Sequence, residues 1–124
     1  MPDLPTERCI QRQIIAVIRL QYPGVWYCAI PNGAHLAGDA QARFRQIGAL
    51  KGDGLKIGAP DLVCVWNGGG KFLEVKRPKT GRVSDDQQKV HEYLGAVGWP
   101  VAIVKSVEDA VAALDAAGAP RCGS

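Results

Sequence analysis

The sequence predicts an α/β domain in which a small mixed sheet is flanked by helices. Segments with apolar residues at helical spacing alternate with short runs of branched and aromatic residues. Two of these runs are separated only by Asn67-Gly68-Gly69-Gly70, a length and composition that suit a hairpin between antiparallel strands. The resulting order is helix, strand, a loop with some helix, two strands, helix, strand and helix. This order fits a single α/β domain.

Three segments have the apolar periodicity of amphipathic helices. The first follows Thr6 and ends before Pro23. The second begins at Ser84 and ends before a Gly-Trp-Pro sequence, and the third begins at Ser106. A mixed segment from 38 to about 51 is a further helix candidate, and the glycines after it predict a loop. The three apolar stripes consist of Ile10, Ile14, Val17 and Ile18, of Val90, Tyr93, Leu94 and Val97, and of Val107, Ala110, Val111 and Leu114.

Four runs rich in branched and aromatic residues predict strands. They are residues 25–30, 61–66, 71–77 and 101–104. The first run ends at a Pro-Asn-Gly turn and is expected to be buried. The tryptophans beside these runs are expected in the core, and they are Trp26, Trp66 and Trp99.

The composition is that of a globular protein, because 47% of the 124 residues are hydrophobic and 22% are charged. This size suits one domain spanning residues 1–124, with a frayed tail at 118–124. No apolar run approaches the roughly 20 residues of a membrane span, and the first residues do not resemble a secretory signal. We therefore expect a cytoplasmic protein without a membrane partner. Four widely spaced cysteines favour reduced thiols over a zinc site, and Cys28 and Cys64 are expected to pack as small hydrophobes.

The basic residues are clustered along the sequence, although the net charge is only +3. Such clusters suit a polyanionic partner, but a row of lysines is also common on a solvated face. Charge alone leaves both interpretations open. The first cluster consists of Lys71, Lys76, Arg77, Lys79, Arg82 and Lys89, and the second of Arg43, Arg45, Lys51 and Lys56.

Charged residues stand inside the two runs of the predicted hairpin. Because side chains alternate along a strand, Glu74 and Lys76 share one face, about 7 Å apart. Asp61 opens the partner run, and antiparallel pairing brings it near Glu74. Two carboxylates and one ammonium group then converge. The alternative is that Glu74 and Lys76 are solvent-facing residues of an edge strand, where lysine discourages aggregation.

Pro60-Asp61 followed by Glu74-x-Lys76 resembles the signature of the PD-(D/E)XK nuclease superfamily, with its halves on adjacent strands. The surrounding stretches KGDGLKIGAPDLV, FLEVKRPKTGRVSDDQQ and GWPVAIVKSVEDAVAAL closely resemble the VRR-NUC branch of that superfamily. The resemblance covers residues 6–114. It implies a restriction-endonuclease-like core and a stand-alone nuclease of bacteria or of phage-infected cells.

The resemblance also implies the substrate and the assembly. Stand-alone members of the family work as homodimers on branched DNA, four-way (Holliday) junctions in particular, whereas fused members cut flaps. Two active sites suit a junction, because its resolution needs two symmetric cuts. A DNA-binding module on a nuclease-like fold and a sequence-specific restriction-type endonuclease are the alternatives. No small-molecule cofactor is expected.

Hydrolysis of a phosphodiester needs an activated water, a means of spreading negative charge and a protonated leaving group. Mg²⁺ or Mn²⁺ serves all three needs, and Mg²⁺ prefers oxygen ligands. Asp61 and Glu74 are the expected ligands, and the resemblance adds the backbone oxygen of Val75. We expect Asp61, Glu74 and Lys76 to be catalytic. Because two carboxylates adjoin Lys76, an electrostatic role suits it better than that of a general base.

Two further residues match family positions, and each has a structural alternative. Glu7 matches an acidic metal-site residue on the first helix, but a glutamate after a threonine cap is also favoured by the helix dipole. Gln87 matches a glutamine thought to approach the catalytic site, and we expect it to be a further catalytic residue. Ser84-Asp85-Asp86-Gln87 is also a capping box, a structural role that is compatible with a place at the site. The loop with Asn32, Gly33 and His35 is a weaker candidate for DNA contact.

Overall fold

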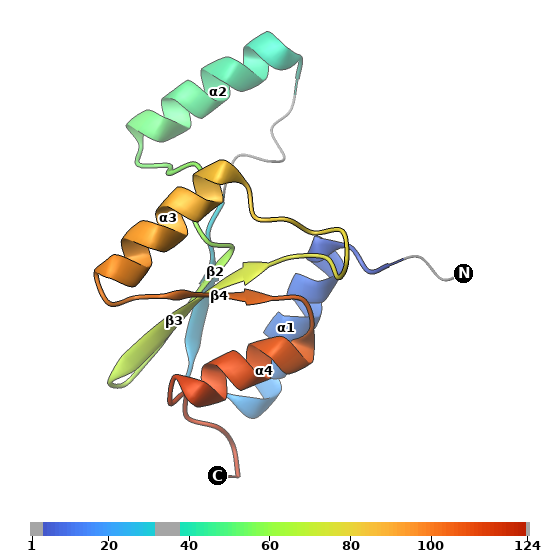
Figure 1. Cartoon of the computed structure of the whole chain (residues 1–124), viewed down its shortest axis with the longest axis vertical. Coiled ribbons are helices and arrows are strands. Elements are labelled where there is room, and N and C mark those ends of the chain that lie inside the picture. Colours follow the sequence, from blue (N-terminus) through green and yellow to red (C-terminus); the bar gives the residue numbers. More distant parts are fainter. Residues whose placement is uncertain (1–3, 32–37, 124) are drawn as a thin grey trace.

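The computed structural model describes residues 4–31 and 38–123 of the chain. These residues form a four-stranded mixed sheet and four helices (Figure 1), which confirms the predicted fold class. The helices are α1 (Glu7–Gln21), α2 (Ala40–Gly52), α3 (Asp85–Ala96) and α4 (Val107–Ala116), and the strands are β1 (Trp26–Ala29), β2 (Leu62–Trp66), β3 (Gly69–Val75) and β4 (Val101–Val104).

The sheet has the strand order β1-β2-β3-β4. The β1–β2 and β2–β3 pairs are antiparallel, whereas β3 and β4 are parallel. The expected hairpin between β2 and β3 is present, but β3 begins at Gly69, so its turn consists only of Asn67 and Gly68. Gly68 has a φ of 91°, which glycine adopts without strain. Leu62 lies opposite Leu73, and this register fixes which residues of the two strands share a face.

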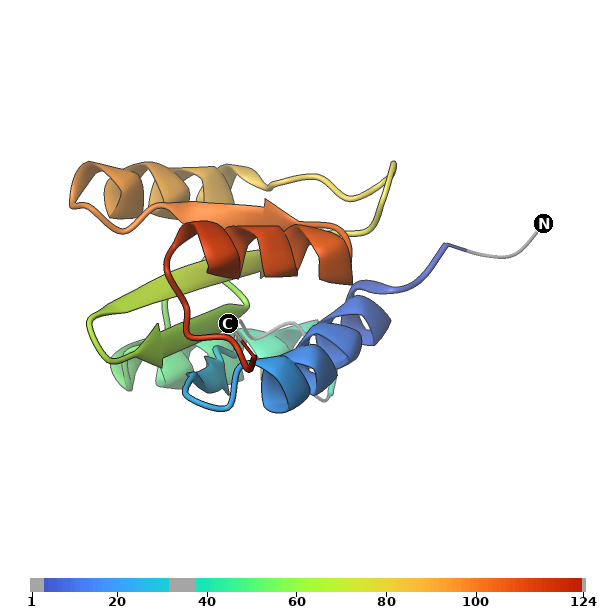
Figure 2. The ribbon, with the colours of Figure 1, turned by 90° about the horizontal axis from the view of Figure 1, so that it is seen from below.

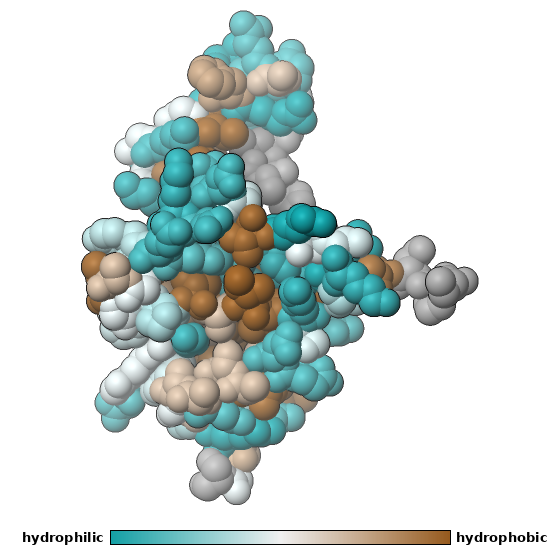
Figure 3. Space-filling model, in the orientation of Figure 1, coloured by the Kyte–Doolittle hydropathy of each residue, from teal (hydrophilic) through white to brown (hydrophobic). Residues whose placement is uncertain are grey.

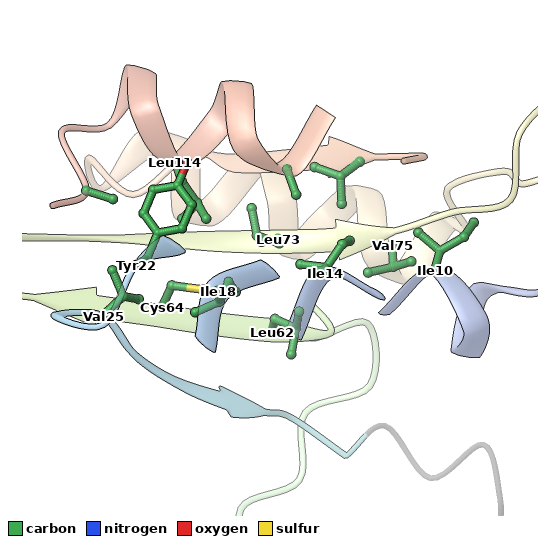
Figure 4. Close-up of a cluster of buried hydrophobic side chains, with 13 residues drawn as sticks. Ile10, Ile14, Ile18, Tyr22, Val25, Leu62, Cys64, Leu73, Val75 and Leu114 are labelled. Carbon is green, nitrogen blue, oxygen red and sulfur yellow. The ribbon is translucent and has the colours of Figure 1, made fainter. Parts of the chain in front are cut away.

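The helices form layers on the two faces of the sheet (Figure 2). On one face, α1 and α4 pack against each other and against β3. On the other face, α3 packs near β4 and makes the crossover that two parallel strands require. The core lies between the sheet and the α1–α4 layer (Figure 4), and it consists of Ile10, Ile14, Ile18, Tyr22, Val25, Leu62, Cys64, Leu73, Val75, Val104, Ala110, Leu114 and Ala119.

Helix α1 is anchored by a cap and by a buried stripe. The hydroxyl of Thr6 accepts a hydrogen bond from a backbone N–H of the first turn at 3.1 Å. Ile10, Ile14 and Ile18 recur at every fourth position, and each is at most 2% exposed. Truncating one such side chain typically costs about 2–5 kcal/mol. Since Ile10 lies beside Val75 (Figure 4), the stripe holds the start of α1 near the end of β3.

Strand β1 is an edge of the sheet and is less buried than the sequence predicts. Trp26 is 62% exposed and Trp99 is 49% exposed, while Trp66 is half-buried against the core. Cys64 is buried, but Cys28 is exposed. The expectation of a buried first strand and of a core position for Trp26 and Trp99 is wrong, because no helix of the described chain packs on β1.

Two helices bury little apolar surface. The predicted helix near residues 38–51 is confirmed as α2, but it packs against none of the other described helices and strands. It stands away from the sheet (Figure 1), its surface is largely hydrophilic (Figure 3), and Phe44 is 79% exposed. On α3, the predicted stripe is partly solvent-facing, since Tyr93 is 67% and Val97 51% exposed.

The segment after α4 lies against α1, although the sequence predicts fraying there. The N–H of Cys122 donates to the carbonyl of Gln21 at 2.6 Å. The guanidinium of Arg121 bonds Asp115 and Gln21, and it lies 5.6 Å from the ring centroid of Tyr22. These contacts tie the described part of the tail to both helices of the α1–α4 layer. In the residues that the structure describes, no helix is long and apolar enough to cross a membrane.

Candidate active site

Asp61 and Glu74 lie opposite each other at the end of the hairpin. The pairing of Leu62 with Leu73 places the residue before β2 opposite Glu74. Asp61 is fixed at this point by two bonds. Its carbonyl accepts from the N–H of Ile30 at 2.8 Å, and its Oδ2 accepts from the N–H of Val75 at 2.7 Å. The expected approach of the two carboxylates is therefore present.

Glu74 is a fully buried carboxyl group in the middle of the fold. It points to the face of the sheet opposite Leu73, which is the face that α3 covers. Its Oε1 lies 3.0 Å from Nε2 of His91 on α3. Its Oε2 is buried and meets no hydrogen-bond donor among the described residues. An unpaired buried carboxylate oxygen is costly unless a proton or a cation satisfies it.

The surroundings of Glu74 favour its protonated form. Burial raises the pKa of Glu74 to about 9, and Asp61 contributes through a hydrogen bond and through its charge. The charge of Lys76 opposes this shift, and that of Glu7 adds to it weakly. Burial and the charge of Lys76 lower the pKa of His91, while Asp61 opposes them. Without a cation, the contact between Glu74 and His91 is therefore a hydrogen bond between neutral groups at neutral pH.

Lys76 is held inside the fold beside these groups. It is only 6% exposed, and its backbone N–H donates to the carbonyl of Val104 at 3.0 Å. Its ammonium charge acts on both Glu74 and His91. The interpretation of Glu74 and Lys76 as solvent-facing residues of an edge strand does not hold, because both are buried and β3 is an inner strand.

Val75 presents its backbone towards Asp61. Because the N–H of Lys76 bonds to β4, the alternation of backbone groups turns the N–H and the carbonyl of Val75 to the other side. The N–H is used by Asp61. The carbonyl oxygen therefore faces the side on which the Asp61 carboxyl lies.

Glu7 occupies the first position of α1 and is exposed. Its charge reaches Glu74, but its effect on the pKa of that residue is the smallest of those that act on it. Arg77 positions this end of the helix, since its guanidinium donates to the carbonyl oxygens of Leu4 and Pro5 at 3.1 and 3.2 Å. Glu7 is thus a neighbour of the carboxylate pair at the mouth of the site.

Gln87 forms the capping box that its sequence context predicts. Its Oε1 accepts from the N–H of Ser84 at 2.9 Å, and its own N–H donates to the Ser84 hydroxyl at 3.2 Å. The backbone here packs closely against Gly58, where an added Cβ would lie 2.5 Å from the carbonyl of Asp86. The loop that leads to Asp61 is therefore fitted to the start of α3.

His91 is a site residue that the sequence analysis missed. It lies four residues after Gln87, so both project from the same side of α3, and this spacing was the available signal. In the sequence, His91 is a lone histidine on a helix without an obvious partner, so it did not stand out as a candidate site residue. Its partner becomes visible only when α3 is placed against β3.

The donors present suit a hard divalent cation held by a pair of carboxylates. Within residues 4–31 and 38–123, no group of three or more histidine, cysteine, aspartate or glutamate side chains is arranged to hold a metal ion. The fit rests on Asp61 and Glu74 together with the buried, unpartnered Oε2 of the latter. Oxygen donors of this kind match Mg²⁺ or Mn²⁺, which complete their coordination with water.

The basic clusters are only partly surface features. Lys76 is buried, and Arg77 is engaged with backbone carbonyls. The remaining residues of both clusters are solvent-facing except Lys71, which is half-buried. Asn32, Gly33 and His35, named above as candidates for DNA contact, lie outside the described residues.

Comparison with known proteins points to one family. A family model described as "VRR-NUC domain" matches residues 7–108. A solved structure described as "VRR_NUC domain protein" has a TM-score of 0.69 and 16% sequence identity, and the match covers 94% of this chain and 91% of that chain. This likeness shows a shared fold. No curated protein matches the chain.

Proposed function

Because the chain belongs to the VRR-NUC domain family, we propose that it is a metal-dependent endonuclease that hydrolyses phosphodiester bonds of DNA. Family membership supports a nuclease-type function in DNA processing. The observation that carries the proposal is the buried Glu74 carboxyl, which lies beside Asp61 and Lys76 with an oxygen that meets no donor in the described chain. A folded protein retains such a costly group where function requires it.

Asp61, Glu74 and the backbone oxygen of Val75 would hold the ion, either Mg²⁺ or Mn²⁺. When bound, the ion supplies a more acidic water and stabilises charge on the phosphate. The N–H of Val75 fixes one oxygen of the Asp61 carboxylate. The fold therefore contributes two carboxylates whose orientation is set before the substrate arrives.

Lys76 contributes a buried positive charge. Because the side chain is only 6% exposed, its ammonium group is weakly screened and acts strongly on a nearby phosphate. We assign it the stabilisation of the negative charge that develops in the transition state and the orientation of the attacking water. Glu7 would bind the ion through water, and Gln87 would line the site while capping α3.

The proposed substrate is branched DNA, and the proposed assembly is a homodimer. The exposed basic residues Lys79, Arg82 and Lys89 follow β3 and suit contacts with phosphates. A pair of active sites matches the two symmetric cuts that resolve a four-way junction. A DNA-binding module without activity would also need these exposed basic residues. It would not need a buried carboxyl group at position 74. A restriction-type enzyme would show a strong preference for one sequence.

Cleavage of labelled linear, flap and four-way DNA with Mg²⁺ or Mn²⁺ tests the proposal. Lys76→Ala is expected to lower the cleavage rate about 10²- to 10³-fold, as loss of an oxyanion donor does elsewhere. Lys105→Ala is the matched control, because Lys105 is exposed and follows the neighbouring strand β4. Absence of metal-dependent cleavage on every substrate would refute the nuclease, and equal rates for Lys76→Ala and the parent would refute the role of Lys76.

A further inference from the structure

We infer that His91 is a positioning residue that orients the Glu74 carboxylate towards a divalent cation, an inference that rests on the function proposed above. Its Nε2 lies 3.0 Å from Oε1 of Glu74, and the two side chains are 14% and 0% exposed. A buried hydrogen bond of this kind restricts the rotation of the glutamate.

The two carboxylates of the site are held in the same way. One oxygen of Asp61 accepts from the backbone N–H of Val75, and one oxygen of Glu74 is bonded to the imidazole of His91. Each carboxylate is thus left with a second oxygen for a ligand. Carboxylates that bind metal ions generally accept hydrogen bonds from residues that do not themselves contact the ion, and these bonds orient the carboxylates.

Without the imidazole, Oε1 of Glu74 would lose its hydrogen-bond partner. Its Oε2 meets no donor in the described chain, so the interaction with Asp61 would then be the main contact that orients the carboxyl. The carboxylate would be free to turn towards Lys76, whose charge acts on it. A turned carboxylate would no longer be placed to hold an ion together with Asp61, and the affinity for the ion would fall.

Local contacts at its first turn hold helix α3 beside the site. Its first turn is closed by the capping box of Ser84 and Gln87, and it fits closely against Gly58 in the loop before Asp61. His91 lies one turn further along the same side of the helix. The imidazole is therefore fixed relative to both carboxylates, which is what an orienting residue requires.

Calorimetric titration of the metal-free protein with Mn²⁺ tests this role without relying on cleavage. His91→Ala is expected to weaken Mn²⁺ binding about 10- to 100-fold. His91→Gln is expected to recover most of the affinity, because its amide N–H replaces the donor. Gln88→Ala, an exposed position on the same helix, is the control and should bind as the parent does. Thermal melting of each variant reports whether it is folded at the titration temperature.

The outcomes separate this role from the proposed function. Equal Mn²⁺ affinity of His91→Ala and the parent overturns the inference while leaving the nuclease intact. Loss of binding in a folded His91→Gln variant also overturns it, because the donor alone then does not suffice. If His91→Ala is unfolded, the Mn²⁺ affinity of His91→Gln decides whether the inference holds. A parent that neither binds Mn²⁺ nor cuts DNA overturns both.

Discussion

Glu74 is the residue whose burial most needs an explanation. Its carboxyl is fully buried, one oxygen meets no donor in the described chain, and a second carboxyl lies beside it. At a pH where it must ionise, such a group costs more free energy than a neutral one of the same shape. The spacing of Asp61, Glu74 and Lys76 on two strands predicted that the three side chains lie close together. The sequence did not reveal His91, because that contact depends on how α3 packs on the sheet.

The Glu74→Gln variant tests whether the buried Glu74 carboxyl has a raised pKa, through the pH dependence of the stability of the metal-free protein. The folded-state pKa of Glu74 is raised to about 9, above the ordinary value of 4.5. The favourable contribution of the protonated form is therefore complete below the ordinary value, and it is lost as the pH rises towards 9. The parent should lose stability relative to Glu74→Gln over this range, by at most about 1.4 kcal/mol per pH unit. Urea unfolding at several pH values, with a chelator present, measures the difference.

A constant difference between parent and variant across this pH range would contradict the burial of an ionisable Glu74. Glu92→Gln is the control, because Glu92 is exposed on α3 and its neutralisation should give no such trend. Cleavage by Glu74→Gln should be lost even where its stability is higher. Loss of cleavage together with higher stability would show that the Glu74 carboxylate serves activity rather than the stability of the fold.

At the scale of elements, the site depends on how the loop before β2 meets α3. Periodicity and caps predicted the helices and strands, because α1 has a stripe at every fourth residue and α3 has a capping box. The exposure of β1 and the isolation of α2 were not predictable in the same way. An apolar run looks the same whether it lies in the centre or at the edge of a sheet. Only tertiary packing decides between the two.

Gly58→Ala probes the contact between loop and helix. Gly58 has a φ of 89°, and an added Cβ would lie 2.5 Å from the backbone of Asp86. Gly54 is the matched control, because its φ is 106° but nothing lies within 4 Å of its added Cβ. Both alanine variants carry backbone strain of about 1–3 kcal/mol, whereas only Gly58→Ala also displaces α3. Chemical unfolding should therefore show a larger loss for Gly58→Ala, with a larger fall in Mn²⁺ affinity. Equal losses would mean that the close packing at Gly58 is unimportant.

At the scale of the whole molecule, a 13.2 kDa chain carries one proposed site, and resolution of a junction needs two. Sedimentation should give twice this mass for the active species, and a four-way junction should be cut symmetrically in paired strands. A monomer at concentrations that support full activity would contradict the proposed homodimer. Preference for a flap over a junction would contradict the proposed substrate while leaving the metal site untouched.

A crystal structure of the protein with Mn²⁺ would test most directly whether Asp61 and Glu74 hold a divalent cation, because the anomalous signal of Mn²⁺ locates the ion. We predict a peak beside the carboxylates of Asp61 and Glu74, with His91 still bonded to Glu74. The peak should disappear in Glu74→Gln crystals grown under the same conditions. A Mn²⁺ ion bound elsewhere, or no ion at these carboxylates while the parent cuts DNA in solution, would contradict the central claim.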